Sequence, residues 1–253
     1  MVTTALLALL LFLPYLVPLR EARPLPTTSP YPNGFMVEAC GIRWHGQVWQ
    51  AQPAPKAWVL LLHGFSGSTF SFRHVGPALA DQGFSALAVD IPPFGWSQRS
   101  RPQQDEATCL AQLLRSWAGQ APVVVIGHSM GAPLAAAVAA ELGSQVQAVV
   151  AVAGPLGAKT DGSSWRKLMA SPPLGRWAEV VSQRKLLKPE SFARTLASAY
   201  GRDPQPEEVA GYREPLLVRG TAKAVFRQLP WRGRAGASLD HLPILLLWGR
   251  EDR

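Results

Sequence analysis

The sequence predicts an α/β protein built on an open, mostly parallel sheet with helices on both faces. Short apolar runs alternate with helix-length segments along the chain, and this alternation is typical of parallel sheets. Because each run is apolar at nearly every position, we expect strands that are covered on both faces. The runs occupy residues 58–62, 85–89, 122–126, 146–153 and 243–248.

Helix-length segments separate the first four runs. They cover residues 72–82, 105–118 and 132–142. A glycine follows each segment, where a helix end favours positive φ: Gly83, Gly119 and Gly143. Two shorter strands, at residues 35–44 and 47–50, are expected before the first run, with Gly46 in the turn between them.

Composition excludes a disordered chain and a coiled coil, since 47% of the 253 residues are hydrophobic and only 17% are charged. Cys40 and Cys109 lie in unrelated segments, and we expect two reduced thiols. The net charge is +8, with most of the excess between residues 157 and 240. No nucleic-acid motif accompanies it, so we expect a solvated basic face, with an anionic substrate or anionic lipid headgroups as the alternatives and no nucleic acid partner.

The first nineteen residues carry no charge and are largely apolar. As a helix they would rise about 28 Å, close to the thickness of a bilayer core, although Pro14 and Pro18 would disturb it. Three interpretations remain open: a membrane anchor, a cleaved signal, and a mis-set start. We expect membrane association through residues 1–19, or a secreted or periplasmic protein if the segment is cleaved. Residues 20–34 follow as a linker rich in Pro, Thr and Ser.

Gly127-His128-Ser129-Met130-Gly131 has the pattern G-x-S-x-G between a β-branched run and an Ala-rich helix. This context predicts a nucleophile elbow, in which a sharp strand-to-helix turn presents the Ser129 hydroxyl at the sheet edge. Ligands of such sheets bind beyond the carboxyl ends of the strands, so the chemistry is expected there.

An acyl-transfer serine requires an oxyanion hole. The backbone N–H of Met130 supplies one expected donor, and the N–H of Phe65, in the loop after the first run, supplies the other. Gly64 permits close backbone approach in this loop. His63 is expected to order the loop through a hydrogen bond rather than to act as a base.

These pieces resemble the α/β-hydrolase superfamily over residues 35–253, and most closely its lidded, serine-nucleophile branch of esterases and carbon–carbon bond hydrolases. The resemblance rests on His63-Gly64, the elbow, and the segments 90–97 and 247–252. It implies an α/β-hydrolase fold with a helical lid insertion. Relatives with an aspartate at the elbow, such as epoxide hydrolases and dehalogenases, are excluded by Ser129.

The resemblance also implies a domain organisation and a substrate pocket. The expected parts are an anchor or signal segment at 1–19, a linker at 20–34, the first part of the core at 35–154, a helical lid at 155–240, and the start of the second part of the core at 241–253. Substrate-binding residues are expected at His63, Gly64, Phe94 and Trp96. The lid aromatics are expected to line an apolar site above them: Trp165, Trp177, Tyr200, Tyr212, Phe226 and Trp231.

Ser129 needs an imidazole base that is oriented by a carboxylate. Asp252, after the last run, fits the acid in the superfamily order of Ser, then acid, then His. The histidines present fit the base poorly; His241, for example, precedes the last strand and is expected far from Ser129. We therefore expect a truncated chain, lacking a C-terminal strand and helix and a following histidine.

The sequence thus predicts a serine hydrolase that acts on a carboxylic ester or similar acyl substrate through a Ser-Asp-His triad and an acyl-enzyme. The alternative is a non-catalytic binding protein of the same fold that lacks the triad histidine. No cofactor is expected, and no metal-ligand spacing, phosphate loop or dinucleotide motif occurs in the sequence.

Overall fold

The computed structural model describes residues 9, 11–19, 23–157, 171–228, 239, 242–250 and 252, with the backbone alone at 173 and 226–228. Contacts divide the chain into two compact units. The helical unit comprises Met1–Leu25 and Asp161–Trp231, and the sheet unit comprises Pro26–Thr160 and Arg232–Arg253. Each unit is described by itself.

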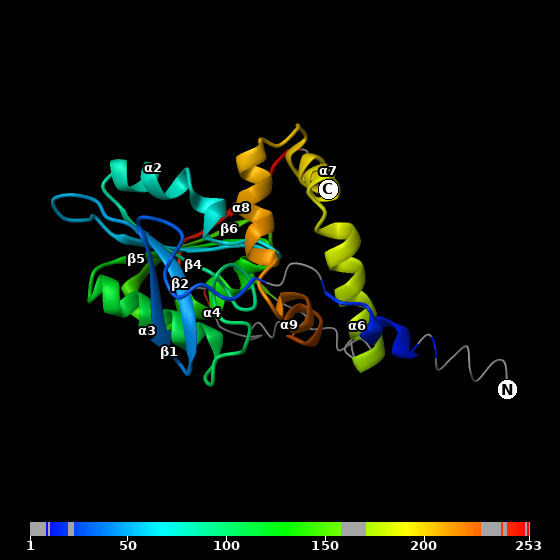
Figure 1. Cartoon of the computed structure of the whole chain (residues 1–253). Helices are drawn as coiled ribbons and strands as arrows, with labels where there is room; N and C mark the ends of the chain where they lie inside the picture. The colour runs from blue at the N-terminus through cyan, green and yellow to red at the C-terminus, as the bar shows by residue number, and fades with distance from the viewer. Residues whose placement is uncertain are drawn as a thin grey trace. The chain divides into compact units, whose positions relative to one another are not determined.

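The sheet unit contains one mixed sheet whose strands follow the order β1-β2-β4-β3-β5-β6-β7 (Figure 1). Its strands are β1 (Gly34–Ala39), β2 (Ile42–Trp49), β3 (Trp58–Leu62), β4 (Ser85–Val89), β5 (Val123–His128), β6 (Val146–Val152) and β7 (Ile244–Leu247). β1 and β2 pair antiparallel, β2 pairs antiparallel with β4, and the remaining neighbours are parallel. The α/β prediction is therefore confirmed.

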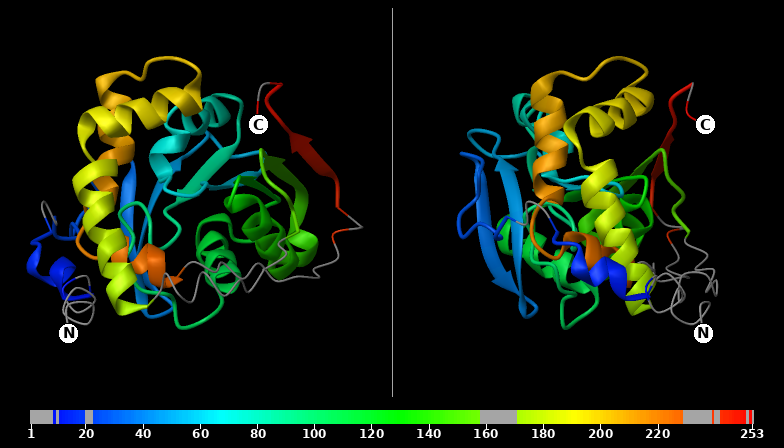
Figure 2. Two further views of the ribbon diagram at one scale, coloured as in Figure 1. Left: turned by 90° about the vertical axis from the view of Figure 1, so that its right-hand side faces the viewer. Right: turned by 45° about the vertical axis from the view of Figure 1, so that its right-hand side comes forward.

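The continuously apolar runs form the middle of the sheet because helices cover both of its faces. Every residue of β3 and β4 is buried. The covering helices are α2 (Val75–Asp81), α3 (Glu106–Ala118) and α4 (Gly131–Leu142). Figures 1 and 2 show α3 and α4 on one face of the sheet and α2 on the other. Short 3₁₀ turns, η1 (Thr69–Phe72) and η2 (Gly143–Gln145), precede α2 and follow α4.

The first hairpin differs from the sequence prediction. Gly46 lies inside β2, opposite Phe35, and does not form a turn. The turn is Cys40-Gly41, where both residues have positive φ, of 51° and 75°. Two-residue hairpins favour this backbone because its twist matches that of the flanking strands. The sequence signal was weak because cysteine seldom occupies such a position.

The expectation of two separate thiols is also wrong. Cys40 in the hairpin turn and Cys109 in α3 form a disulfide, with their Cα atoms 6.1 Å apart. The two residues are 69 positions apart in sequence, and only the packing of the hairpin turn against α3 brings them together. The sequence analysis did not predict this disulfide because the two cysteines are far apart in the chain.

Residues 171–228 of the helical unit form four α-helices and one π-helical segment. They are α6 (Pro172–Val181), η3 (Ser182–Leu186), α7 (Pro189–Tyr200), α8 (Pro206–Leu216) and α9 (Thr221–Gln228). Prolines at the first turns of α6, α7 and α8 fit the helix start, where the missing N–H costs nothing. These helices lie within residues 155–240, which the sequence predicts as an insertion.

The apolar leader segment packs within the helical unit. Residues 11–16 are helical. The Arg176 side chain donates to the carbonyl oxygens of Pro14 and Val17, at 3.1 and 3.0 Å, and Arg184 donates to that of Pro18 at 3.4 Å. Within the described part of the chain, no helix has the length and apolar character needed to cross a membrane.

β7 lies at the edge of the sheet and is more exposed than its sequence suggests. It pairs with β6 in parallel, with Leu247 opposite Val152. Its side chains and that of the following Trp248 are between 43% and 55% exposed. An apolar edge of this kind is a site at which other chain segments can pair or pack.

Candidate active site

Ser129 stands at the turn between β5 and α4, as the sequence predicts for a nucleophile. Its φ is +50°, which a residue with a Cβ adopts only under constraint. The constraint comes from both sides: Ser129 N–H donates to the Val152 carbonyl at 2.8 Å, and Ala132 N–H donates to the Ser129 carbonyl at 3.0 Å. Ser129 is half-buried at this turn.

Two glycines let neighbouring backbone approach this turn. A Cβ at Gly64 would lie 2.8 Å from His128 Nδ1 and 3.2 Å from Ser129 Cβ. A Cβ at Gly154, just after β6, would overlap the Ser129 carbonyl oxygen and lie 2.8 Å from Ser129 Cα. The backbone of the loop after β3 and that of the segment just after β6 therefore both pack in close contact with the elbow. The sequence analysis identified Gly64 but missed Gly154, whose only signal is its place directly after an apolar run.

His63 organises the loop that carries the expected oxyanion donor. Its ring is fully buried; Nδ1 lies 2.7 Å from the Gly64 carbonyl oxygen, and Nε2 accepts the Ile91 N–H at 2.9 Å. Burial lowers the pKa of His63 below its ordinary value, more than the Asp90 charge raises it. A neutral ring with both nitrogens engaged orders the loop, and it has no surface left for the substrate contact that we also expected.

The aromatic residues expected at the pocket divide into two kinds. Phe65 is 52% exposed, whereas Phe94 is 3% exposed and packs edge-on against Phe65, with ring centroids 5.1 Å apart. The buried Phe94 ring therefore packs against the loop that carries Phe65. Trp96 is half-buried, and its backbone N–H donates to Asp90. The N–H groups of Phe65 and of Met130, which directly precedes α4, remain the predicted oxyanion donors.

Asp252 lies in the turn that follows β7. Its N–H donates to the Gly249 carbonyl at 3.1 Å, and the side chain is exposed. Its negative charge reaches His128: loss of hydration lowers the pKa of His128, and Asp252 opposes that shift. Because β7 is parallel to β6 and β6 to β5, the turn that carries Asp252 lies at the same edge of the sheet as the elbow, where the triad acid is predicted.

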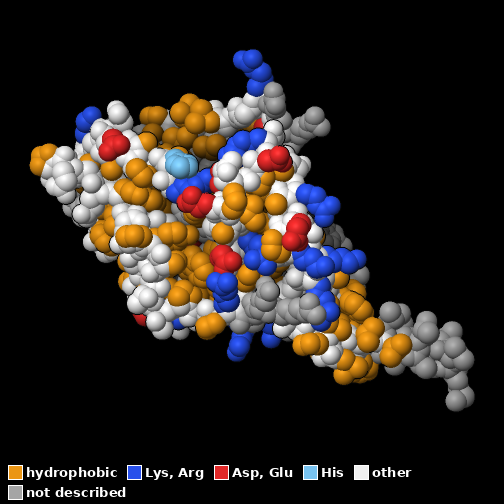
Figure 3. Space-filling view, turned by 45° about the horizontal axis from the view of Figure 1, so that its top comes forward, with side chains coloured by type: hydrophobic (Ala, Val, Ile, Leu, Met, Phe, Trp, Pro, Cys, Tyr) orange, Lys and Arg blue, Asp and Glu red, His pale blue; other side chains and the backbone are white. Residues whose placement is uncertain are grey.

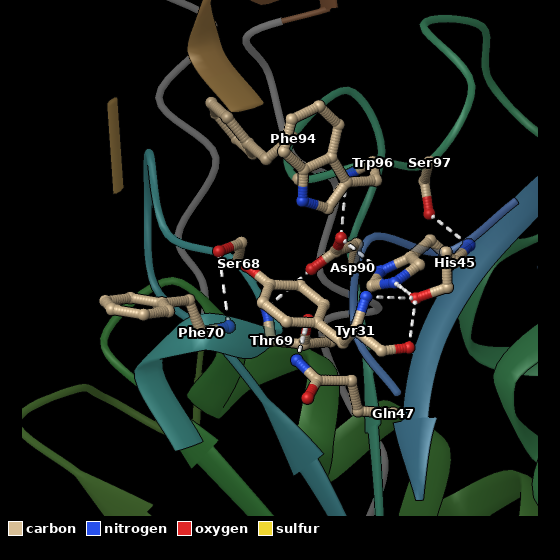
Figure 4. Close-up of polar contacts among 12 residues, drawn as sticks. Tyr31, His45, Gln47, Ser68, Thr69, Phe70, Asp90, Phe94, Trp96 and Ser97 are labelled. Carbon is tan, nitrogen blue, oxygen red and sulfur yellow. Dashed lines mark hydrogen bonds and ion pairs between the residues drawn. The ribbon is translucent and has the colours of Figure 1, made fainter. Parts of the chain in front are cut away.

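The sequence analysis missed a buried polar network next to this edge. Asp90 and His45 are both fully buried, with Oδ2 and Nδ1 2.7 Å apart. Burial raises the pKa of Asp90, but the His45 charge and hydrogen bond, with further donors, outweigh it and hold the pKa below its ordinary value. Figure 4 shows that the side chains converge from β2 and from the loop after β4. His45 carries no sequence signal because its partner lies 45 positions away.

Some predicted residues cannot be placed. His241, Trp165 and Trp231 lie outside the described residues, and of Phe226 only the backbone is described. Tyr200 and Tyr212 are described in the helical unit, where their rings meet edge-on, with centroids 6.5 Å apart. Among the described residues, no group of three His, Cys, Asp or Glu side chains is arranged to hold a metal ion.

Comparison with known proteins identifies the family. The sequence profile of the alpha/beta hydrolase fold matches residues 57–253, which is most of the chain. The chain therefore belongs to the alpha/beta hydrolase family, and its relatives support a hydrolase.

Three relatives illustrate the range of the family. An uncharacterized hydrolase, YugF, of Bacillus subtilis is 29% identical over 210 residues, covering 77% of this chain and 72% of the relative. A monoacylglycerol lipase of Mycolicibacterium smegmatis is 27% identical over 229 residues, covering 84% and 76%. The solved structure of the epoxide hydrolase CorEH has a TM-score of 0.63 at 21% identity and covers 86% of this chain and 82% of its own; it shows the fold alone.

Proposed function

We propose that the protein is a serine hydrolase that cleaves carboxylic esters through an acyl-enzyme. The observation that carries the proposal is Ser129 at φ +50°, on a strand-to-helix turn with the backbone of Gly64 packed against it. A strained serine facing a glycine-bearing loop is the arrangement that acyl transfer requires, because the hydroxyl and the amide donors must meet at one carbonyl group.

The proposed reaction assigns a role to each predicted group. Ser129 Oγ attacks the ester carbonyl carbon while a histidine takes its proton, and the N–H groups of Phe65 and Met130 hold the oxyanion. The proton passes to the leaving alcohol as the C–O bond breaks. Water, deprotonated by the same base, then releases the carboxylic acid from Ser129. Asp252 orients the imidazole and stabilises its charged form.

The base is the group that the site leaves open. His45 and His63 are excluded because both are buried and bonded within the fold. Among the described histidines, His128 is a candidate because it directly precedes the nucleophile and the charge of Asp252 acts on its pKa. A His128→Ala variant tests this candidate: full labelling by a fluorophosphonate excludes His128 as the base.

A fluorophosphonate probe on the full-length protein tests the proposed function. We expect stoichiometric labelling that Ser129→Ala abolishes. Ser116→Ala is the matched control, because Ser116 Oγ bonds only to the Leu113 carbonyl of its own helix among the interactions described, and this variant should label fully. No labelling of the folded wild-type protein would instead support a binding protein of the same fold.

Epoxide hydrolysis is the second candidate, because a bifunctional epoxide hydrolase of Sus scrofa is 34% identical to this chain over 149 residues. Members of the superfamily with that activity have a carboxylate at the elbow, and this chain has Ser129. We therefore expect p-nitrophenyl butyrate to be hydrolysed and styrene oxide to be left intact. Epoxide opening that survives Ser129→Ala would favour the second candidate.

A lipid-derived substrate is the proposed class, and it agrees with the leader segment. The similar monoacylglycerol lipase acts, by its name, on an acylglycerol. Large apolar side chains of the leader are exposed, Phe12 at 67% and Leu16 at 77%. Figure 3 shows hydrophobic side chains gathered at the N-terminal end of the molecule beside Lys and Arg. A cavity of about 430 Å³ between the leader, α6 and α9 is lined by Arg219 and Lys223, among others.

We propose that the leader associates with an anionic membrane surface, its apolar side chains in the acyl region and the neighbouring cations on the headgroups. Flotation with phosphatidylcholine vesicles, with and without phosphatidylglycerol, tests this. Wild-type protein should float with the anionic vesicles, and a variant carrying Phe12→Glu and Leu16→Glu should not. A mature protein that begins after residue 19 would establish a cleaved signal instead.

A further inference from the structure

Ser29, His45 and Asp90 form a chain of contacts that joins the segment before the sheet, β2 and the loop after β4. His45 Nδ1 is 2.7 Å from Asp90 Oδ2, and His45 Nε2 is 3.0 Å from Ser29 Oγ. Since the Asp90 carboxylate is an acceptor only, Nδ1–H donates to it. Tyr31 N–H donates to Ser29 Oγ at 3.1 Å and fixes the hydroxyl. We call Ser29, His45 and Asp90 the buried relay.

The buried relay is not a second nucleophilic centre. A Cβ at Gly34 would overlap Ser29 Oγ, so the hydroxyl is packed against the start of β1. Ser29 also lacks the positive φ that exposes Ser129. Because the backbone of Gly34 packs against the Ser29 oxygen, we assign the relay a role through the groups that it holds.

Asp90 connects the buried relay to the two loops that border the active site. Its Oδ1 accepts the Thr69 N–H at 2.5 Å, and its Oδ2 accepts the Trp96 N–H at 2.6 Å (Figure 4). Thr69 begins η1, four residues after the predicted oxyanion donor Phe65. One buried carboxylate therefore ties the end of the oxyanion loop to the loop after β4.

Two residues of β2 form further hydrogen bonds with the same two loops. His45 N–H donates to Ser97 Oγ at 2.9 Å, and Gln47 Nε2 donates to Thr69 Oγ1 at 2.9 Å. A buried carboxylate is costly unless donors satisfy it, and two loop amides supply part of that compensation. Rotation or loss of the His45 ring would therefore move Asp90 and, with it, Thr69 and the loop before it.

We propose that Ser29, His45 and Asp90 are positioning residues that set the oxyanion loop against Ser129, so that a residue of the segment before the sheet controls the rate of acyl transfer. This proposal rests on the proposed function. It predicts a loss in kcat rather than in substrate affinity, because the oxyanion donors stabilise the transition state more than the bound ester.

The test compares Ser29→Ala with Ser85→Ala in the full-length protein. Ser85 is buried, whereas Ser29 is half-buried; the Ser85 Oγ also accepts a backbone hydrogen bond, from the Ala51 N–H at 3.1 Å, but it lies at the opposite end of β4 from Asp90. We expect Ser29→Ala to lower kcat for p-nitrophenyl butyrate about tenfold, with KM within twofold, since sub-ångström misplacement of reacting groups has effects of this order. Ser85→Ala should keep kcat at a similar melting temperature.

A histidine series provides the second measurement. His45→Gln, whose amide can still donate to Asp90, should recover part of the kcat that His45→Ala loses. Equal kcat for Ser29→Ala and Ser85→Ala, or no difference between the two His45 variants, would overturn the proposal while wild-type activity leaves the proposed function standing. A folded wild-type protein that neither reacts with a fluorophosphonate nor hydrolyses the ester overturns both.

Discussion

Substituting Gly64 by Ala tests how closely the oxyanion loop must approach the elbow. The added Cβ would lie 3.2 Å from Ser129 Cβ and 2.8 Å from His128 Nδ1. Carbon atoms in contact prefer about 3.5 to 4.0 Å, so the loop and Ser129 must separate by roughly 0.3 to 0.8 Å. The φ of Gly64 is not positive, so the backbone itself tolerates Ala and the effect comes from the contact.

We expect Gly64→Ala to lower kcat/KM for p-nitrophenyl butyrate about 10- to 100-fold, because a misplacement approaching 1 Å at a reacting centre has a cost of that order. The crowding should also lower the free energy of unfolding by about 1 to 3 kcal/mol. Ester hydrolysis and the rate of fluorophosphonate labelling measure the first effect, and urea unfolding measures the second.

Gly157→Ala is the matched control, since no heavy atom lies within 4 Å of its added Cβ. It should retain wild-type kinetics and stability. If Gly64→Ala is folded and hydrolyses the ester within twofold of the wild-type rate, the loop does not contribute to the transition state in the way described, and the oxyanion assignment of Phe65 fails with it.

Three further outcomes are expected. Gly154→Ala should lower the free energy of unfolding by about 3 kcal/mol and abolish fluorophosphonate labelling, because its Cβ would overlap the Ser129 carbonyl oxygen. Burial lowers the pKa of His63 in the folded protein, so the unfolded chain binds a proton at this residue at a higher pH than the folded protein does. The free energy of unfolding, measured in urea, should therefore have its full value above about pH 6.5 and decrease below it. It should decrease less steeply in His63→Gln. Reduction of the Cys40–Cys109 disulfide removes a cross-link between residues 69 positions apart, so it should lower the melting temperature and lower the free energy of unfolding by up to about 4 kcal/mol on the chain-entropy model. Cys109→Ser should be insensitive to dithiothreitol.

The central strands could be predicted because their signal is local. The run at residues 85–89 is β4 residue for residue, since a strand buried on both faces must be apolar at every position. The hairpin could not be predicted in the same way, because its turn depends on positive φ at Cys40, a residue with no preference for that conformation.

The candidate site likewise has one part with a local sequence signal and one part that depends on contacts between distant residues. Ser129 could be identified from five consecutive residues, because the G-x-S-x-G pattern, the preceding strand and the following helix are contiguous in the chain. The contact of His45 with Asp90 could not, because β2 and the end of β4 become neighbours only when the sheet forms.

By itself, the sequence determined that this chain forms a mostly parallel α/β sheet and presents one serine at a strand-to-helix turn, since both properties arise from residues adjacent in the chain. Tertiary structure alone decided that Gly154 packs against that serine, that Cys40 meets Cys109, and that one buried carboxylate holds two loops. The disulfide, the Gly154 contact and the Thr69–Asp90 hydrogen bond join residues 21 to 69 positions apart, and no local preference of the chain encodes contacts over such separations.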